Sequence, residues 1–494
     1  MTDRRGVLGA HPGETNAGES MVLTNGRLEE NGPSVDIAAE RGWVVDIRPH
    51  AKGVGAAVPD TEWLDARGGL ILPGLHDHHV HLRAAAAALD SVEAGPPAVR
   101  NQAELARALD RPGSGWIRAV GYHDSVAGSL DRHALDRLAP GRPIRVQHRS
   151  GALWVLNSAG LAALEAALPA HAGVERDREG RPTGRLFRMD DWLAGQIQPA
   201  PIDLAEVGTR AARAGVTGFT EAGPEPTPAT LSWLADQRAE GRLAQRLVVM
   251  SPTNGVGGVP EDGTAPGARD GGLVWGPAKF LLDDDDLPGL EELTHRFDRV
   301  HRQGRPVAVH CVTRAQLFLT LAALTESRPA VGDRIEHGSV IPSEAVADIA
   351  RLGLAVVTNP GFILQRGDEY RSDVEPADQP HLYRARSLLD AGIAVAAGTD
   401  APFGPADPWT AMRAAVERRT ADGRPLGPGE AVKAGAALGL FLADPLNLPR
   451  SRRIEVGGPA DLLVLGCPLS EAIATGTGAD VMATVIGGRI VHCE

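Results

Sequence analysis

The sequence lacks the features that mark several large protein classes. Only three of its 494 residues are cysteines, at positions 311, 467 and 493, and no two have CxxC spacing. This excludes a disulfide framework and a thiolate zinc site, and it favours a reducing compartment. No run of about 18 apolar residues occurs, and the N-terminus has no apolar signal segment. We therefore expect a cytoplasmic protein without a membrane span.

Positive charge is also in short supply. Lys and Arg number 50 against 63 Asp and Glu, which gives a net charge of −13. A phosphate backbone or an anionic membrane has little reason to bind such a chain. We expect a small-molecule partner, with no nucleic acid and no membrane.

The two ends of the chain share one pattern of short apolar runs separated by Asn-Gly and Gly-rich turns, as in "MVLTNGRLEE" and "DVMATVIGGRIVHC". This pattern is typical of antiparallel strands. It predicts one small β domain built from residues 21–75 and 450–494. Residues 1–20 show little periodicity and are predicted to be a disordered leader.

The middle of the chain alternates helical and strand patterns. Three helix-then-strand units are recognisable, in residues 291–310, 343–360 and 382–400. Such alternation predicts an α/β fold with buried parallel strands. No GxGxxG or GxxxxGK[ST] segment follows a strand, which favours a (β/α)₈ barrel over a nucleotide-binding sheet. We assign the barrel to residues 76–449, with insertions between 82 and 278.

The segment "GLHDHHVHL" (74–82) carries the first candidate metal ligands. His79 and His81 lie two residues apart at a predicted strand end, so both imidazoles face one side. By the same alternation His76 and His78 face the other side, and we expect them in a supporting or solvated position.

Further candidates follow other apolar strands. Lys279, His310, His337 and Asp400 each lie at or near a strand end, and their spacing fits barrel strands 4, 5, 6 and 8. In a (β/α)₈ barrel the C-terminal strand ends carry the active site. Strands 2 and 3 are then predicted in residues 142–149 and 214–223.

These residue types together suit a divalent metal. Imidazole nitrogen and carboxylate oxygen are ligands of zinc, which polarises the bond attacked and lowers the pKa of a water. Asp400 is the predicted general base. Lys279 fits the set if its amine has reacted with carbon dioxide to form a bridging carbamate; the alternative is an ion pair with Asp283 or Asp284.

Four further residues are candidates for substrate binding. Arg145, Gln147 and His148 lie on the predicted strand 2, and Glu221 ends the predicted strand 3. Buried polar packing or a salt bridge explains them equally well. Glu336 is either a partner of Arg334 or an acid close to the metal.

Several segments resemble the amidohydrolase superfamily in order along the chain. "ILPGLHDHHVHL", "RIEHG" and "AGIAVAAGTDAPFGPADPW" are similar to its strand 1, 6 and 8 motifs, and "GGPADLLVL" to its C-terminal signature. "RPTGRLF" and "WVLNSAGL" resemble the YtcJ-like or amidohydrolase 3 branch, which contains N-substituted formamide deformylases. The resemblance implies a distorted (β/α)₈ TIM barrel with a β-sandwich made from both termini.

The resemblance also implies a centre of one or two divalent metals, usually zinc, that hydrolyses C–N or related bonds. His79 and His81 would bind the more buried metal and His310 and His337 the second. Lys279 would bridge if carboxylated, and Asp400 would ligate and act as base. Homodimers are frequent among such relatives, so a homodimer is a further expectation.

Two positions depart from the branch. Thr313 and Arg314 replace a usual Gly-Asp pair, and Ala152 stands where a histidine often precedes the Asn-Ser segment. These departures bear on a formamide-type substrate more than on the metals. Two alternatives to an amide hydrolase remain: a deaminase of the same superfamily, with one metal, and a catalytically silent relative, which the six filled ligand positions disfavour.

Overall fold

The computed structural model describes residues 20–51, 61–113, 115–164, 166–197, 202–254 and 273–494. The predicted leader falls almost wholly outside these residues and stays a prediction. Two compact units divide the chain: Met1–His81, Leu204–Asp400 and Pro405–Glu494 form one, and Leu82–Asp203 with Ala401–Gly404 form the other. Among the described residues, every helix is too short or too polar to cross a membrane.

The first unit contains an eight-stranded sheet in which each strand runs parallel to its neighbours. The Asp400 amide donates to the His79 carbonyl at 2.7 Å, which joins the two ends of the sheet. In sheet order the strands are β6 (Leu75–Val80), β13 (Val216–Glu221), β14 (Arg246–Ser251), β15 (Leu273–Phe280), β16 (Val307–Cys311), β17 (Arg334–His337), β18 (Ala355–Thr358) and β19 (Val395–Ala397). This nearly closed sheet confirms the predicted barrel.

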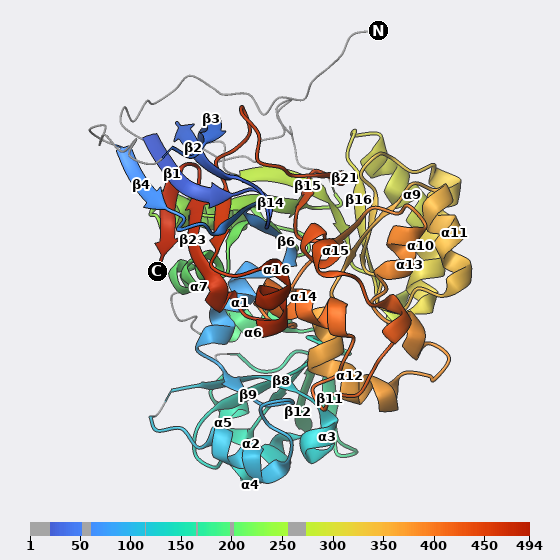
Figure 1. Ribbon diagram of the computed structural model, residues 1–494. Helices are drawn as coiled ribbons and strands as arrows, with labels where there is room; N and C mark the ends of the chain where they lie inside the picture. The colour runs from blue at the N-terminus through green and yellow to red at the C-terminus, as the bar shows by residue number, and fades with distance from the viewer. Residues whose placement is uncertain (1–19, 52–60, 114, 165, 198–201, 255–272) are drawn as a thin grey trace. The chain divides into compact units, whose positions relative to one another are not determined.

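Helices follow most barrel strands, as buried parallel strands require. Figure 1 shows α9, α10, α11 and α13 gathered on one side of the barrel strands. The helices of this unit are α7 (Ala205–Arg213), α8 (Pro228–Ala239), α9 (Leu290–His301), α10 (Arg314–Ser327), α11 (Ser343–Arg351), α12 (Gly361–Asp373), α13 (Arg386–Asp390), α14 (Pro408–Glu417), α15 (Ala434–Gly439) and α16 (Leu469–Thr475), with short 3₁₀ turns at Asp284–Asp286, Gln379–His381, Pro428–Glu430 and Gly478–Asp480. The three predicted helix-then-strand units are confirmed.

The assignment of barrel strands 2 and 3 was wrong. Residues 214–223 contain strand 2 (β13), and strand 3 is β14, which the sequence reading did not pick out. The segment 142–149 contains a strand of a different sheet. The burial patterns explain the error: β14 is buried over five of its six residues, whereas only every second residue is buried at the start of the 144–148 strand. Continuous burial is typical of a barrel strand covered on both faces.

A second sheet of this unit joins the two ends of the chain. The N-terminal and C-terminal strands lie side by side in Figure 1, and their apolar residues, among them Met21, Ile37, Leu462 and Val485, form one core. The order is β24 (Arg489–Cys493), β23 (Val481–Ile486), β22 (Leu462–Leu465), β5 (Leu70–Pro73), β1 (Ser20–Arg27), β2 (Ser34–Glu40) and β3 (Trp43–Pro49), with β4 (Thr61–Asp65) also paired to β1. A separate hairpin pairs β20 (Ala443–Asp444) with β21 (Asn447–Ser451). The predicted pairing of strands from both ends of the chain is confirmed, whereas the domain bounds 21–75 and 450–494 stay a prediction.

One predicted turn in this sheet is a bulge. Asn25 and Gly26 lie inside β1, where the register to β2 shifts, and Asn25 has a φ of 55°. A Cβ on Gly26 would approach the Ile71 side chain to 2.3 Å. Glycine is needed here because β5 packs against the strand at this point.

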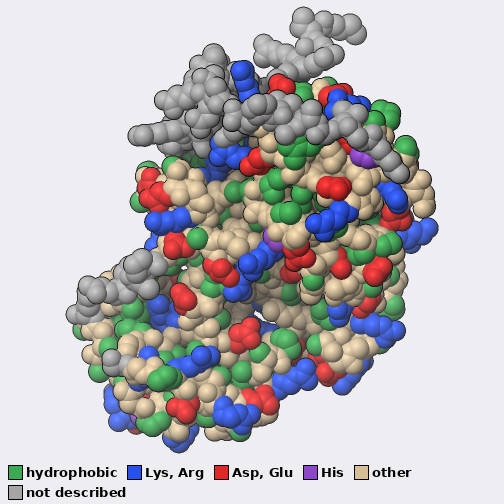
Figure 2. All heavy atoms as spheres, turned by 60° about the vertical axis from the view of Figure 1, so that its left-hand side comes forward, with side chains coloured by type: hydrophobic (Ala, Val, Ile, Leu, Met, Phe, Trp, Pro, Cys, Tyr) green, Lys and Arg blue, Asp and Glu red, His purple; other side chains and the backbone are tan. Residues whose placement is uncertain are grey.

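The second unit has a six-stranded sheet with its own apolar cores. Its strands, in sheet order, are β11 (Val174–Arg176), β12 (Pro182–Phe187), β10 (Leu153–Leu156), β9 (Ile144–His148), β8 (Ile117–Tyr122) and β7 (Val92–Glu93). Its helices are α1 (Leu82–Leu89), α2 (Gln102–Leu109), α3 (Asp124–Ala127), α4 (Arg132–Leu138), α5 (Ser158–Ala162) and α6 (Asp190–Gln196). This unit occupies much of the predicted insertion. On the face drawn in Figure 2, acidic and basic side chains are interspersed.

Candidate metal centre

The strand-1 motif lies in β6, whose six residues are all buried. The register between β6 and β13 slips at this motif, because Asp77 pairs with Phe219 while Val80 pairs with Glu221. Three steps on one strand against two on the other describe a β-bulge. The bulge breaks the simple alternation from which the directions of His76 and His78 were inferred.

His76 and His78 are therefore not solvated. The Nε2 atom of His76 lies 2.9 Å from the Thr220 hydroxyl, and the rings of His76 and His78 are 4.7 Å apart. Burial lowers the pKa of both well below the usual value. They form a neutral layer beside the candidate ligands.

His79, His81 and Asp400 bring their ligand atoms within 4.8 Å of one another. Asp400 Oδ1 lies 3.3 Å from His81 Nε2 and 3.8 Å from His79 Nε2. Asp400 has a φ of 55°, a conformation that residues other than glycine rarely adopt. Such backbone strain is often found at functional sites.

His337 and His310 adjoin this cluster. The ring of His337 is 4.6 Å from those of both His79 and His310, and its Nδ1 is 3.8 Å from Asp400 Oδ2. His337 also has a positive φ, of 66°. The structure thus brings His79, His81 and His337 close to Asp400, and His310 against the ring of His337.

Lys279 completes the predicted set. Its Nζ lies 3.4 Å from His79 Nε2, whereas Asp284 accepts a hydrogen bond from the Thr313 hydroxyl at 2.9 Å. Burial lowers the pKa of Lys279, although Glu336 and Asp400 act in the opposite direction. A lowered pKa favours the neutral amine, which is the form able to react with carbon dioxide.

Two of the candidate histidines, His79 and His337, are held in the neutral form that a metal requires. Burial, followed by nearby cationic groups, lowers the pKa of His79 and of His337 well below the usual value, so both are neutral at pH 7. Asp400 Oδ1 is buried and has no hydrogen-bond partner among the described residues. Buried polar oxygens are rarely left in this state, and an ion is one accepted explanation. The donor set fits a divalent cation such as Zn²⁺.

Sequence reasoning missed the contacts that hold the ligands. The His337 Nδ1 lies 2.8 Å from Asn359 Oδ1, and the Asn359 amide donates to the Gly398 carbonyl at 2.8 Å. Asn359 follows β18, which lies between the strands that lead to His337 and Asp400, and this position at a strand end was the available signal. Polar residues at the ends of the other barrel strands are therefore candidates for the site as much as the histidines are.

Asp77 is the second missed contact. It accepts from the Thr399 amide at 2.9 Å and from the Thr399 hydroxyl, which ties the strand carrying His79 to the segment carrying Asp400. Burial raises the pKa of Asp77 to about 7, against the effect of these hydrogen bonds.

The predicted substrate residues fall into two groups. Glu221 is buried at the end of β13 and accepts from the Gly223 amide at 2.9 Å. Arg145, Gln147 and His148 lie on β9 in the second unit, not on a barrel strand. Arg145 stacks over Trp154, and His148 Nδ1 lies 2.8 Å from the Ser150 hydroxyl. Their role in substrate binding stays a prediction.

The departures at Thr313 and Arg314 have a structural explanation. Thr313 caps α10 in a reciprocal capping box with Gln316. Arg314 forms ion pairs with Asp378 at 2.8 Å and Glu344 at 3.0 Å. Ala152 lies in the second unit, where its carbonyl accepts from the Arg188 amide at 2.8 Å.

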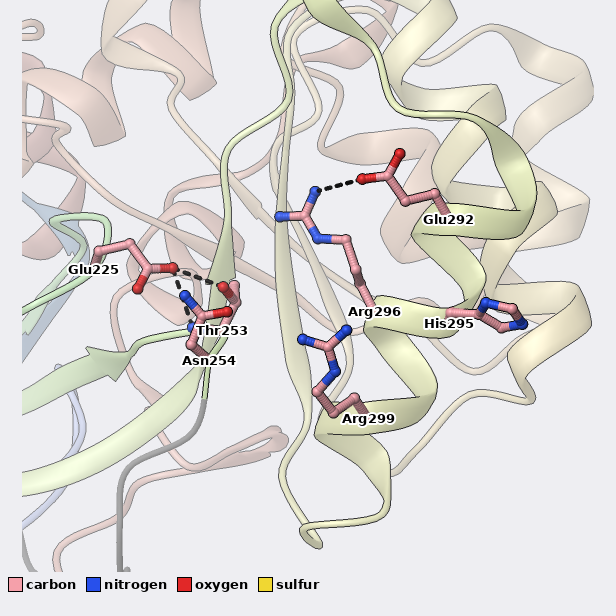
Figure 3. Close-up of a pocket in the computed structure, with 7 residues that line it drawn as sticks. All are labelled: Glu225, Thr253, Asn254, Glu292, His295, Arg296 and Arg299. Atoms are coloured by element: carbon pink, nitrogen blue, oxygen red, sulfur yellow. Dashed lines mark hydrogen bonds and ion pairs between the residues drawn. The ribbon is translucent and has the colours of Figure 1, made fainter.

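A polar surface pocket of about 510 Å³ lies elsewhere in the first unit. Figure 3 shows Arg296 and Arg299 extending from α9 toward the side on which Glu225 accepts from the Thr253 hydroxyl. None of the six predicted ligands lines it. Its mixed charges and open position distinguish it from the buried cluster around Asp400.

Comparisons with known proteins agree with this geometry. Residues 62–492 match the model of the amidohydrolase family. An N-substituted formamide deformylase of Arthrobacter pascens is 27% identical over 83% of this chain and 86% of its own length. A Bacillus subtilis (strain 168) protein named as amidohydrolase YtcJ is 25% identical over 88% of this chain and 91% of its own. A metal-dependent hydrolase of Pyrococcus horikoshii, with 19% identity and a TM-score of 0.68 over 91% of this chain and 98% of its own, shares the fold.

Proposed function

The chain belongs to the amidohydrolase family, in its YtcJ-like branch, and on that premise we propose that it hydrolyses an amide-type carbon–nitrogen bond of a small molecule. The proposed ligands are His79, His81, Lys279, His310, His337 and Asp400. The proposed cofactor is one or two divalent ions per chain, with zinc as the first candidate. We also propose that the protein is located in the cytoplasm and forms a homodimer.

The observation that carries this proposal is the environment of Asp400. Its buried Oδ1 lies 3.3 Å from His81 Nε2 and 3.8 Å from His79 Nε2, and it has no hydrogen-bond partner in the described part of the chain. A carboxylate desolvated in this way is costly unless a cation compensates it. A metal between Asp400, His79 and His81 would satisfy all three side chains.

Asp400 is also the proposed general base. A divalent cation, when bound, polarises the scissile carbonyl and lowers the pKa of a water toward neutrality. Asp400 takes the proton of the attacking water and passes it to the leaving nitrogen. The Asp400 amide donates a hydrogen bond to the His79 carbonyl, and Asp77 accepts one from the Thr399 amide. These two bonds fix the position of the Asp400 carboxylate during both transfers. Proton transfer of this kind contributes about 10²–10⁴-fold to rates.

Lys279 is proposed to bridge two metals as a carbamate. The pKa of its amine, which burial lowers, and its 3.4 Å approach to His79 Nε2 support this assignment. Mass spectrometry under native conditions tests it: the chain should be heavier by one carbon dioxide, and Lys279→Met should abolish the difference. A binuclear enzyme without added mass would rule out the carbamate.

A deaminase of the same superfamily is the second candidate. It is favoured by one observation, that three donors converge within 4.8 Å, which is enough for a single ion. Metal content per chain separates the candidates, because a deaminase is expected to hold one ion and the binuclear amide hydrolase two.

The decisive experiment combines metal content with a substrate screen. We expect zinc, manganese or iron in protein purified without chelator, and turnover of N-substituted formamides, other N-acyl compounds, carbamates or cyclic amides. Formamides come first because of the likeness to the deformylase. A chain that holds no metal, and that gains no activity when metal is added, would refute the proposed function and favour a catalytically silent relative.

A further inference from the structure

A chain of buried side chains runs from the barrel interior to the candidate metal ligands. Arg334 Nε donates to Glu336 Oε1 at 2.5 Å, and the other oxygen of Glu336 is hydrogen-bonded to His79 Nδ1. Arg334 and Glu336 lie on β17, whereas His79 lies on β6. Glu336 and His79 are 257 positions apart in the sequence.

These three hydrogen-bonded side chains are shielded from solvent. Glu336 and His79 are 0% exposed and Arg334 is 2% exposed. A buried carboxylate is costly to desolvate unless an opposite charge and hydrogen bonds compensate it. Arg334 supplies the charge on one side and His79 the hydrogen bond on the other, so both oxygens of Glu336 are used.

The bond to Glu336 determines which nitrogen of His79 is available. Glu336 accepts, so Nδ1 must carry the proton and Nε2 the lone pair. It is Nε2 that lies 3.4 Å from Lys279 Nζ and 3.8 Å from Asp400 Oδ1. A carboxylate behind a metal-binding histidine also fixes the orientation of the ring and increases its basicity.

Arg334 extends this chain toward the opposite end of the barrel. It lines a groove of about 920 Å³ at the N-terminal ends of β15 to β19, together with Trp275, Asp333 and Ala355. The active site of such barrels lies at the C-terminal strand ends. Arg334 therefore anchors the chain at the floor of the barrel, away from substrate.

We propose that Glu336 is a positioning residue that holds His79 in its metal-binding tautomer, and that Arg334 keeps this carboxylate in place. The inference rests on the proposed function, since it needs His79 to bind a metal. Glu336 touches neither substrate nor the reacting atoms. Its effect is on the affinity for metal and, through the metal, on the rate.

The test compares Glu336→Gln with the wild-type protein by competition for Zn²⁺ with a chromogenic chelator at one pH. In the Gln side chain one of the two carboxylate oxygens is replaced by an NH2 donor, so either Arg334 or His79 loses its acceptor. Loss of such a contact costs about 10–100-fold in metal affinity. We expect the dissociation constant of the most tightly held ion to rise by about that factor, and kcat to recover in excess Zn²⁺.

Glu430→Gln is the matched control. Glu430 is another buried carboxylate of the same unit, 6% exposed, paired with Arg384 at 2.9 Å and bonded to Ser387. Its loss should lower the melting temperature and leave the affinity for Zn²⁺ unchanged. A merely structural role of Glu336 would give the same result.

Glu336→Asp is the second variant, in case Glu336→Gln fails to fold. It keeps the negative charge beside Arg334 but is one methylene shorter, so it cannot reach both partners. We expect weaker Zn²⁺ binding in this folded variant. Wild-type affinity in either variant would overturn the inference and leave the proposed function intact. A wild-type protein without Zn²⁺ affinity would overturn the proposed function itself, and the inference with it.

Discussion

The candidate metal centre has two halves that differ in construction. At the ends of strands 1 and 8, His79, His81 and Asp400 converge within 4.8 Å. At the ends of strands 5 and 6, His310 and His337 lie ring to ring, 4.6 Å apart, and His337 Nδ1 lies 3.8 Å from Asp400 Oδ2. The first half has enough donors for an ion, whereas the second needs Asp400 or a carbamate on Lys279.

The two halves also differ in the contacts that hold their candidate ligands in place. The first half is supported by three hydrogen-bonded contacts, from Glu336, from Asp77 and from the Asp400 amide. In the second, Asn359 Oδ1 lies 2.8 Å from His337 Nδ1, which is also 3.8 Å from Asp400 Oδ2. We expect the first half to bind metal more tightly, and the following predictions test that comparison.

The largest effect is expected from Asp400→Asn, because Asp400 belongs to both halves. The amide cannot take a proton from water, and its nitrogen is no metal ligand. We expect kcat to fall about 10³-fold, within the range of general-base catalysis. Steady-state kinetics at saturating Zn²⁺ measures the loss. A fall of less than tenfold would show that another group is the base.

His81→Ala and His310→Ala compare the halves directly. His81→Ala should lose the tightly held ion, while His310→Ala should retain it and lose only the second. Elemental analysis of the two purified variants gives the ratio of metal to protein, and circular dichroism confirms the fold. Equal loss in both variants would contradict the unequal construction.

Asn359→Ala should have a smaller effect, limited to the second half. The His337 ring would lose the partner of its Nδ1 but keep its place on β17. We expect the affinity of the weaker ion to fall about tenfold, at the low end for such contacts. Isothermal titration with Zn²⁺ resolves the two binding steps. A change confined to the binding of the tighter ion would contradict the assignment of Asn359 to the second half.

The smallest effect is expected at Cys311, which follows His310 on β16. Burial raises the pKa of this thiol to about 12, and the side chain is 1% exposed. We expect no alkylation of Cys311 at pH 8, with or without metal, because the thiolate is the reactive form. Exposed Cys493 is the internal control. Labelling of Cys311 after chelation, read by mass spectrometry, would show that the second half opens when metal leaves.

The positions of the candidate ligands at strand ends could be predicted because each follows a local pattern. Apolar runs before His310, His337 and Asp400 define buried strands, and a strand end in a parallel barrel faces the site. The same logic failed for residues 142–149, where alternating apolar residues were read as a barrel strand. The alternation was the signal of a half-exposed strand in another sheet.

The sequence by itself determined the barrel, the terminal β domain and the residues that surround Asp400, because periodicity and spacing are local properties of the chain. Only the tertiary structure decided the bulge at His78 and His79, the clasp of Asp77 on Thr399 and the carboxylate behind His79. These depend on register between strands and on pairs as far apart as residues 79 and 336. No local pattern encodes which buried acid meets which histidine, since that choice is made when the barrel closes.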